Sequence, residues 1–305
     1  ESNRVGADDE LSQEAIEAMD LEDVPNTAEF YREVDEDDRM GDEAADTFMD
    51  DGPQESEAMV DVLREAGVSA NAAEEATQRM FGLRTGPTML EVYGTSVHAH
   101  LQRRNLNIQG LGALDIRTVK PNGEPWDFNK RSDRREVKDM INRLNPDWVI
   151  GSPPCTPFSI WNFGINYKKI EPEKVKSMIA EGQVHLNFVC SLYRSQMRRG
   201  RYFLHEHPAT ALSWKEDQVK ALARELTVQI VTANQCEYGL VTPSAENRDI
   251  MVPAMKPTRF MTNSPMMANQ LSQRCKGGHE HQHLVGNRCR DAAFYPIPLV
   301  RAMLR

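Results

Sequence analysis

Apolar residues recur with two different spacings between residues 88 and 231 of this chain. Short apolar runs predict strands over 88–93, 108–116, 147–150, 201–205 and 228–231. Apolar positions three or four residues apart predict helices over 97–105, 133–144, 173–199 and 213–226. This alternation predicts an α/β fold with a doubly wound, mostly parallel sheet. Beyond Gly239 the pattern changes to short extended pieces at 249–253 and 258–262, and residues 297–304 predict a final helix.

The first 58 residues carry 22 acidic and three basic side chains and no sustained apolar period, whereas the remaining 247 residues carry 24 acidic and 33 basic side chains. Such a segment buries too little apolar surface to offset its ordering entropy. We therefore expect a disordered acidic linker over 1–58, a helical linker over 59–83 and one folded domain over 84–305. The acidic segment is either a solvated linker or a shield for a basic nucleic-acid groove.

Five cysteines at irregular spacing do not suggest a disulfide framework and favour a reducing compartment. No run of about 18 apolar residues occurs, so no membrane span is expected. The chain starts at Glu1 without a secretory signal, which suggests a fragment of a longer precursor.

The strongest candidate for chemistry is the segment Gly151–Ser159, which reads Gly-Ser-Pro-Pro-Cys-Thr-Pro-Phe-Ser. Its two prolines fix the backbone and hold Cys155 just beyond the carboxyl end of the strand at 147–150, the edge at which ligands bind in open α/β sheets. Cys155 is either a nucleophile, reactive as the thiolate, or a small buried apolar residue. This Pro-Pro-Cys loop, followed by Phe-Ser, resembles the nucleophile loop of the C5-cytosine methyltransferases.

The resemblance implies a Rossmann-like fold and the cofactor S-adenosyl-L-methionine. By this resemblance the turn after the first strand holds the methionine end, an acid at the end of the second strand holds the ribose, and a following loop holds the adenine. The family usually has a second glycine where this chain has Ser96. The implied cofactor-binding residues are Tyr93, Gly94, Thr95, Ser96, Asp115, Ile116, Asp127, Phe128 and Pro153.

Attack of a thiolate on cytosine also needs a proton or a strong hydrogen bond at the ring nitrogen N3. Glu206, at the end of the strand 201–205, stands where the family has a glutamate, although the residues that follow it differ from those of the family. Alternatively, Glu206 pairs with a nearby arginine or histidine. Arg248 lies in a segment that resembles an arginine-containing part of the family, where it would contact the base or a phosphate.

The family inserts a target-recognition domain before its last motif, which residues 293–300 resemble. Only residues 253–291 stand in that place here, and we expect them to form a reduced recognition insert. Within 15 residues they contain two cysteines and three histidines, enough ligands for a zinc ion. Their spacing matches no common zinc finger, so a polar loop with scattered histidines is the alternative. These metal candidates are Cys275, His279, His281, His283 and Cys289.

Three groups of basic residues can neutralise phosphates. They are Lys130, Arg131, Arg134 and Arg135; Lys168 and Lys169; and Arg194, Arg198, Arg199 and Arg201.

The expected function is methyl transfer to C5 of a cytosine in DNA through a Cys155 adduct, in the nucleus, with the target base flipped out. A partner or flanking domain would supply target recognition.

Two alternatives remain open. The acidic linker and the run from Ser152 to Pro208 also resemble methyltransferase-like modules embedded in retroelement polyproteins. The first alternative is therefore a catalytically degenerate module of such a polyprotein, with a nucleic-acid-binding or structural role. The second is a zinc-supported binding domain.

Overall fold

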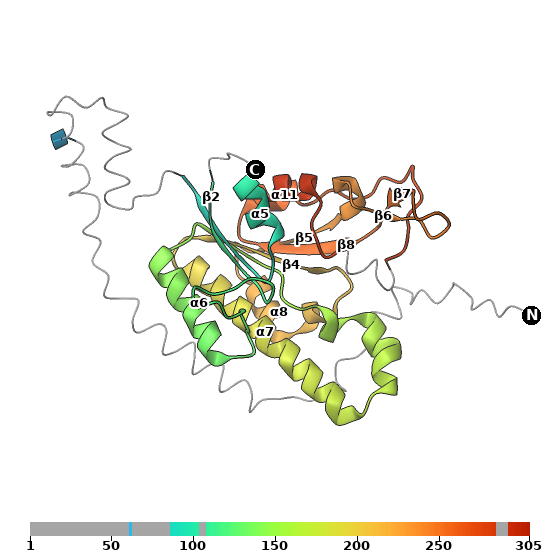
Figure 1. The fold of residues 1–305 in the computed structure, drawn as a ribbon, viewed down its shortest axis with the longest axis horizontal. Helices are drawn as coiled ribbons and strands as arrows, with labels where there is room; N and C mark the ends of the chain where they lie inside the picture. The colour runs from blue at the N-terminus through green and yellow to red at the C-terminus, as the bar shows by residue number, and fades with distance from the viewer. Residues whose placement is uncertain (1–60, 63–85, 104–107, 285–291) are drawn as a thin grey trace, which may run out of the picture.

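The computed structural model describes residues 61–62, 86–103, 108–284 and 292–305. The expected acidic linker 1–58, nearly all of the helical linker 59–83, and Cys289 lie outside the described residues. The described part is a mixed α/β structure built on one six-stranded sheet (Figure 1). None of its helices is long and apolar enough to cross a membrane.

The central sheet has the strand order β2-β1-β3-β4-β8-β5. Its first four members in this order run parallel to one another, whereas β8 runs antiparallel to both of its neighbours. The mostly parallel sheet predicted from the sequence is therefore confirmed, with one reversed strand near an edge. The strands are β1 (Thr88–Val92), β2 (Gln109–Leu114), β3 (Trp148–Gly151), β4 (Tyr202–Pro208), β5 (Gln229–Asn234) and β8 (Pro257–Thr262).

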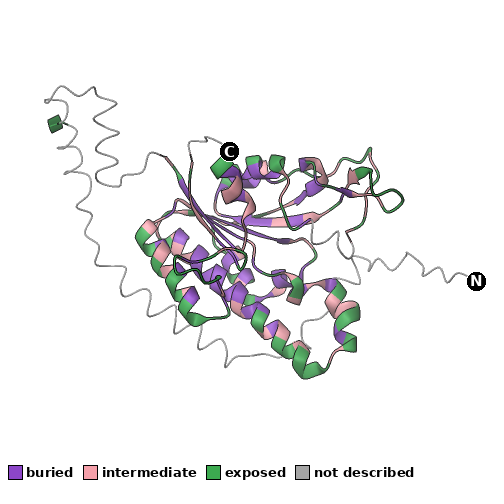
Figure 2. Cartoon of the chain, in the orientation of Figure 1, coloured by how far each residue is buried: buried purple, intermediate pink, exposed green. Residues whose placement is uncertain are grey.

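Helices cover both faces of the sheet (Figures 1 and 2). Successive side chains of a strand point to opposite faces, so Leu90 and Val149 join one core while Met89 and Ile150 join the other. This double burial explains why the strands appear in the sequence as continuous apolar runs. One face carries α6 (Arg131–Leu144), α7 (Pro172–Arg198) and α8 (Asp217–Ala223), and the other carries α5 (Ser96–Arg103), α9 (Pro265–Gln270) and α11 (Ile297–Met303).

The segment 253–291, expected to be a recognition insert, contributes directly to the sheet. A two-stranded hairpin of β6 (Val241–Pro243) and β7 (Met251–Pro253) leads into β8, which pairs with β4 on one side and β5 on the other. Because β8 is antiparallel, its amino end lies at the carboxyl edge of the parallel strands. The residues just before β8 therefore reach the edge where ligands are expected.

The loop after β3 continues through three short helical turns before α7 begins. These are η3 (Thr156–Phe158), η4 (Asn162–Asn166) and η5 (Tyr167–Lys169). Phe158 is buried beneath the first turn, and a Cβ on Gly182 of α7 would lie only 2.7 Å from the Pro157 Cβ. Since α7 presents a glycine at this contact, the loop that carries Cys155 packs closely on the helix.

Gly151, at the end of β3, is also in close contact with α7. The Tyr193 hydroxyl donates a hydrogen bond to the Gly151 carbonyl at 3.2 Å, and a Cβ on Gly151 would overlap that hydroxyl oxygen. We expect Gly151→Ala to lower the free energy of unfolding by about 1–3 kcal/mol, because overpacking a rigid core forces neighbours to shift. Urea denaturation would measure the effect.

Tyr193→Phe provides the matched control for this prediction. It removes the hydroxyl, and the nearest ring carbon at position 193 would then lie 3.1 Å from the added Cβ. The double variant should therefore lose less stability than the sum of the two single variants. If the stability loss of the double variant equals the sum of the two single losses, the Tyr193 hydroxyl is not what excludes a side chain at position 151.

Candidate active site

The carboxyl edge of the sheet contains a topological switch point. β1 pairs with β2 on one side and with β3 on the other, so the loops that follow β1 and β3 diverge and leave a crevice where ligands bind in such sheets. Two pockets of about 240 and 290 Å³ lie there and share Tyr93, Ser152 and Pro154. Together they fall within the range of roughly 300–1,000 Å³ found for small-molecule sites.

The first pocket brings Cys155 and Glu206 together. Both line it, along with the turn after β1, and so do two cationic residues, Arg117 and Lys256. Half-buried Cys155 is the N-cap residue directly before the helical turn η3. The pocket that it lines contains both cationic and acidic side chains, which suits a cysteine with a nucleophilic role beside a proton-handling group.

A buried histidine fixes the backbone of the Pro-Pro-Cys loop. The Pro153 carbonyl can only accept, so His207 donates to it through Nε2 at 2.9 Å. The Ser213 hydroxyl then donates to Nδ1 at 2.6 Å. Burial lowers the pKa of His207, which keeps the imidazole neutral and suited to this pair of contacts.

Glu206 presents a carboxylate oxygen for which the described residues provide no hydrogen bond. The side chain is 6% exposed, and its Oε1 lies 3.8 Å from the Lys256 ammonium nitrogen. That lysine donates to the Ala292 carbonyl at 3.0 Å. The oxygen therefore has a cationic ion-pair partner but no hydrogen bond from the described residues, and it lies in the pocket that Cys155 lines.

A second buried carboxylate lies behind the turn after β1. Glu91 accepts hydrogen bonds from Val97 N at 3.0 Å and His98 N at 2.8 Å, so its Oε2 caps the first turn of α5. Its Oε1 is buried with no hydrogen bond from the described residues, and a Cβ on Gly94 would come within 2.5 Å of it. Glycine at position 94 therefore keeps the space beside this oxygen open.

The turn itself has an unusual backbone. Tyr93 has a φ of 61°, which a residue with a side chain adopts at a cost in conformational energy. Its ring packs edge-on against Phe128, and its hydroxyl lies 2.8 Å from His185 Nδ1. These contacts hold the turn between the two pockets.

The second pocket contains most of the other residues expected to bind a cofactor. Asp115, Ile116, Asp127 and Phe128 line it, and Ile116 is 72% exposed. The Asp115 carboxylate accepts from Arg117 Nε at 2.6 Å and from Arg117 Nη2 at 3.1 Å. Part of its hydrogen-bonding capacity is thus used within the chain, although a carboxylate has about four acceptor sites.

Several residues of the pockets were not identified from the sequence. They are Glu91, Arg117, Glu181, His185, Lys256 and Tyr295. Glu91 had a detectable signal, since it is an acidic residue inside a short apolar run. Tyr295 also had one, since it lies in residues 293–300, which resemble the last motif of the family. Lys256 had none, because it comes from a segment about 50 residues after Glu206 and reaches the pocket only through tertiary structure.

Arg248 lines neither pocket and lies on the exposed turn between β6 and β7. Two members of the third basic group contact other parts of the chain at the opposite edge of the sheet. Arg201 pairs with Asp147, and Arg199 donates to the Ile141 carbonyl. Lys168 and Lys169 are exposed in η5, in the helical loop that follows Cys155. Of the three basic groups, this pair belongs to the same loop as Cys155.

The metal candidates fall into two sets. Cys275, His279 and His281 come together with Cys236, which the sequence reasoning did not include. His283 is not part of that group, and Cys289 lies outside the described residues. Cys236 was missed because it precedes Cys275 by 39 residues and belongs to a different segment of the fold.

No known protein family and no curated protein matches the sequence. Among solved structures, the chain aligns with the Entamoeba histolytica methyltransferase EhMeth at 14% sequence identity and a TM-score of 0.32. The alignment covers 59% of this chain and 54% of the other, so it spans about half the length of that protein. A similarity this low assigns neither fold nor activity.

The buried Glu91 carboxyl makes a specific pH dependence expected. Desolvation by burial raises its pKa from 4.5 to about 7. The folded protein therefore binds more protons than the unfolded chain between these values, and stability falls as the pH rises through this window. Over this pH range the free energy of unfolding should fall by roughly 3 kcal/mol.

Glu91→Gln tests this directly, because its amide oxygen can still accept from α5 but does not ionise. Urea denaturation between pH 4.5 and 7 should give a flatter profile for this variant than for the wild type. Glu173→Gln, at an exposed position on α7, serves as the control and should follow the wild type. Parallel profiles for Glu91→Gln and the wild type would rule out titration of Glu91 in this range.

Proposed function

We propose that this chain is a methyltransferase that transfers a methyl group from S-adenosyl-L-methionine to C5 of a cytosine in DNA. One observation carries the proposal: Cys155 and Glu206 line one pocket, and that pocket adjoins a second one lined by Asp115, Asp127 and Phe128. A nucleophile and a proton-handling group thus lie beside a site of suitable composition for an adenosyl group.

The two side chains have complementary tasks in this reaction. The Cys155 thiolate forms a bond to C6 of the cytosine ring, which makes C5 nucleophilic. Glu206 would hold a proton at N3, where electron density moves as the Cys155 sulfur adds to C6. After C5 is methylated, the C5 proton leaves to a base and the Cys155 sulfur is expelled, which restores the ring. Lys256, 3.8 Å from Glu206 Oε1, adds positive charge where negative charge develops.

The residues of the two pockets fit the proposed cofactor, whose role is to supply an electrophilic methyl group. Asp115 would accept from the ribose hydroxyls and Asp127 from the adenine amine, while Ile116 and Phe128 offer apolar surface to the ring. At the methionine end, the space beside Gly94 leads to the unpartnered Glu91 Oε1, which can accept from an ammonium group. Tyr93, Thr95, Ser96 and Pro153 complete this end of the site.

The surface next to Cys155 supports a nucleic-acid substrate. Lys168 and Lys169 are exposed in the loop after the cysteine, and Trp161 is 44% exposed in the same loop. Cationic and aromatic side chains together suit contacts with phosphates and an unstacked base. Arg248, on an exposed turn, suits a phosphate contact better than a contact with the reacting base. A DNA substrate in turn implies a nuclear location and a flipped target cytosine.

One observation favours the alternative of a catalytically degenerate, nucleic-acid-binding module. The Asp115 carboxylate, on which ribose binding depends in this proposal, is already held by two hydrogen bonds from the Arg117 guanidinium. If that pair does not rearrange, the chain would bind nucleic acid without a methyl donor. Cofactor binding therefore separates the two functions.

The first test concerns the covalent step. Duplex DNA that carries 5-fluorocytosine should form a denaturation-resistant adduct with the wild-type protein in the presence of the cofactor, because fluorine at C5 prevents release of the enzyme. Cys155→Ser should form no adduct and should retain cofactor binding. The four other cysteines of this variant provide an internal control for unspecific trapping. An adduct that persists in Cys155→Ser would contradict the proposed nucleophile.

The second test concerns the cofactor. Calorimetric titration should show saturable binding of S-adenosyl-L-methionine by the wild-type chain and at least a tenfold weaker affinity for Asp115→Ala, a loss of about 1.4 kcal/mol. Asp217→Ala, at an exposed position on α8, removes the same group outside the pockets and should bind like the wild type. Absence of binding by the folded wild type would overturn the methyltransferase proposal in favour of the degenerate module.

A further inference from the structure

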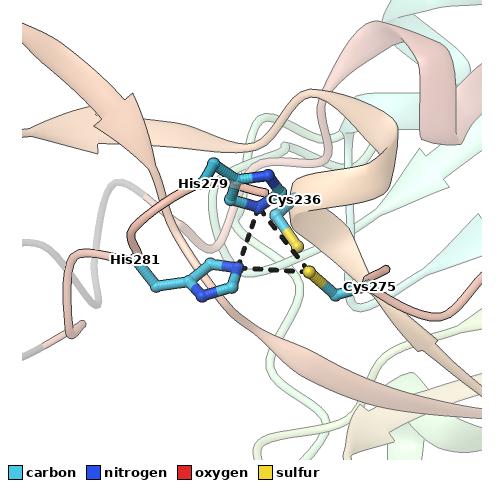
Figure 3. A group of neighbouring side chains, drawn as sticks. All are labelled: Cys236, Cys275, His279 and His281. Carbon is cyan, nitrogen blue, oxygen red and sulfur yellow. Dashed lines mark hydrogen bonds between the residues drawn. The ribbon is translucent and has the colours of Figure 1, made fainter. Parts of the chain in front are cut away.

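Four side chains with the chemistry of metal ligands meet beyond the end of β5 (Figure 3). They are Cys236, in the helical turn η7 (Gln235–Tyr238), and Cys275, His279 and His281, in the segment that follows α9. One ligand atom from each residue lies within 4.8 Å of all the others. We infer that these four residues bind one structural zinc ion.

The separations among the ligand atoms match a tetrahedral zinc site. With Zn–S near 2.3 Å and Zn–N near 2.05 Å, a tetrahedron places sulfur and nitrogen about 3.6 Å apart. The Cys275 sulfur lies 3.6 Å from His279 Nε2 and 3.5 Å from His281 Nε2. The two histidine nitrogens are 2.9 Å apart and would separate by about 0.5 Å around the ion.

The backbone of the segment is shaped for this geometry. Gly277 and Gly278 have φ values of 78° and 86°, a conformation that glycine adopts readily. The resulting turn brings the histidines back toward Cys275, and Gly277 N donates to the Cys275 sulfur at 3.4 Å. An N–H group directed at a cysteine sulfur stabilises the thiolate that a metal ion requires.

Further hydrogen bonds fix Cys275 against the end of β5. Cys275 N donates to Asn234 Oδ1 at 2.9 Å, and Asn234 N donates to the Gln273 carbonyl at 3.0 Å. These hydrogen bonds align the two segments that supply the ligands. Such support around the ligands is what distinguishes a built metal site from histidines that meet by chance.

The ligand set specifies the kind of site. Two thiolates and two imidazoles around one point favour zinc, and four protein ligands leave no position for a water molecule or a substrate. The role is therefore structural. A two-iron cluster with the same residues would place the histidines on one iron and the cysteines on the other, whereas here Cys275 is equally near both histidines.

The zinc ion would fasten the β6–β7 region to the sheet. Gln282, next to the ligand His281, donates from its N to the Pro253 carbonyl at 2.9 Å, and its side-chain oxygen accepts from Ala245 N at 2.7 Å. On the other side, Gln235, next to Cys236, donates to the Lys256 carbonyl at 3.2 Å. The ion would thus stabilise both the hairpin and the segment that places Lys256 near Glu206.

The test measures metal content and does not depend on methyltransferase activity. The 305-residue chain should be produced with an affinity tag that lacks histidines, and purified with a reducing agent and without chelators. Elemental analysis should find one zinc ion per chain in the wild type. Nearly all of this zinc should be lost in each of four variants: Cys236→Ser, Cys275→Ser, His279→Ala and His281→Ala.

Three matched variants should keep the full zinc content. His283→Ala removes the neighbouring histidine, Cys289→Ser removes the other cysteine of the segment, and Cys155→Ser removes the pocket thiol. If His283→Ala or Cys289→Ser loses zinc while His281→Ala retains it, the inferred ligand set is wrong. If the wild type contains no zinc and takes up none after reduction, the zinc site is refuted.

A second measurement covers the case in which the ligand variants fail to fold. Titration of the wild-type protein with a mercurial reagent should release the zinc as the thiols react, and a strong chelator should lower the midpoint of thermal unfolding. Replacement of zinc by Co²⁺ should give the visible absorption of a tetrahedral site with thiolate ligands. Octahedral Co²⁺ absorption, or a midpoint unchanged by complete zinc removal, would contradict a structural Cys₂His₂ site.

Discussion

The pairing of β1 with β3 is the constraint on which the candidate active site depends. These strands are not consecutive in the chain, yet Val92 lies opposite Gly151, and Ser152 N extends the ladder by donating to the Val92 carbonyl at 3.2 Å. The Tyr93 turn and the Pro-Pro-Cys loop therefore start side by side. Because the chain leaves β1 and β3 in opposite directions, the space between the two loops remains open.

The reversed strand β8 determines how that space is completed. If β8 were parallel, the residues before it would lie at the far edge of the sheet. Because it is antiparallel, Pro257 lies opposite Asn234 at the carboxyl end of β5, and Thr258 lies opposite Pro208 at the carboxyl end of β4. Lys256 consequently stands near Glu206, and β5 ends beside the segment that contains Cys275.

The two proposed sites share this edge of the sheet and are connected through short contacts. Cys236 and Gln235 are adjacent, and Gln235 N donates to the carbonyl of Lys256, whose ammonium group forms an ion pair with Glu206. A zinc ion at Cys236 would stabilise one wall of the pocket without contacting the reacting atoms. The chemistry would then rest on Cys155 and Glu206, and the rigidity of that wall would rest on the metal site.

The sequence by itself indicated β1 to β5, the helices α5 to α8 and α11, and the Pro-Pro-Cys loop, because apolar periodicity and paired prolines act over a few residues. It did not indicate β6 or α9, which are short and lie where no sustained apolar period occurs. It also indicated three of the four side chains of the proposed metal site, which lie within seven residues of one another. Tertiary structure alone decided that β8 inserts between β4 and β5, that Lys256 approaches Glu206, and that Cys236 lies beside Cys275, His279 and His281. These outcomes depend on strand order and direction, which are set by backbone hydrogen bonds between segments far apart in the chain and leave no local pattern in the sequence.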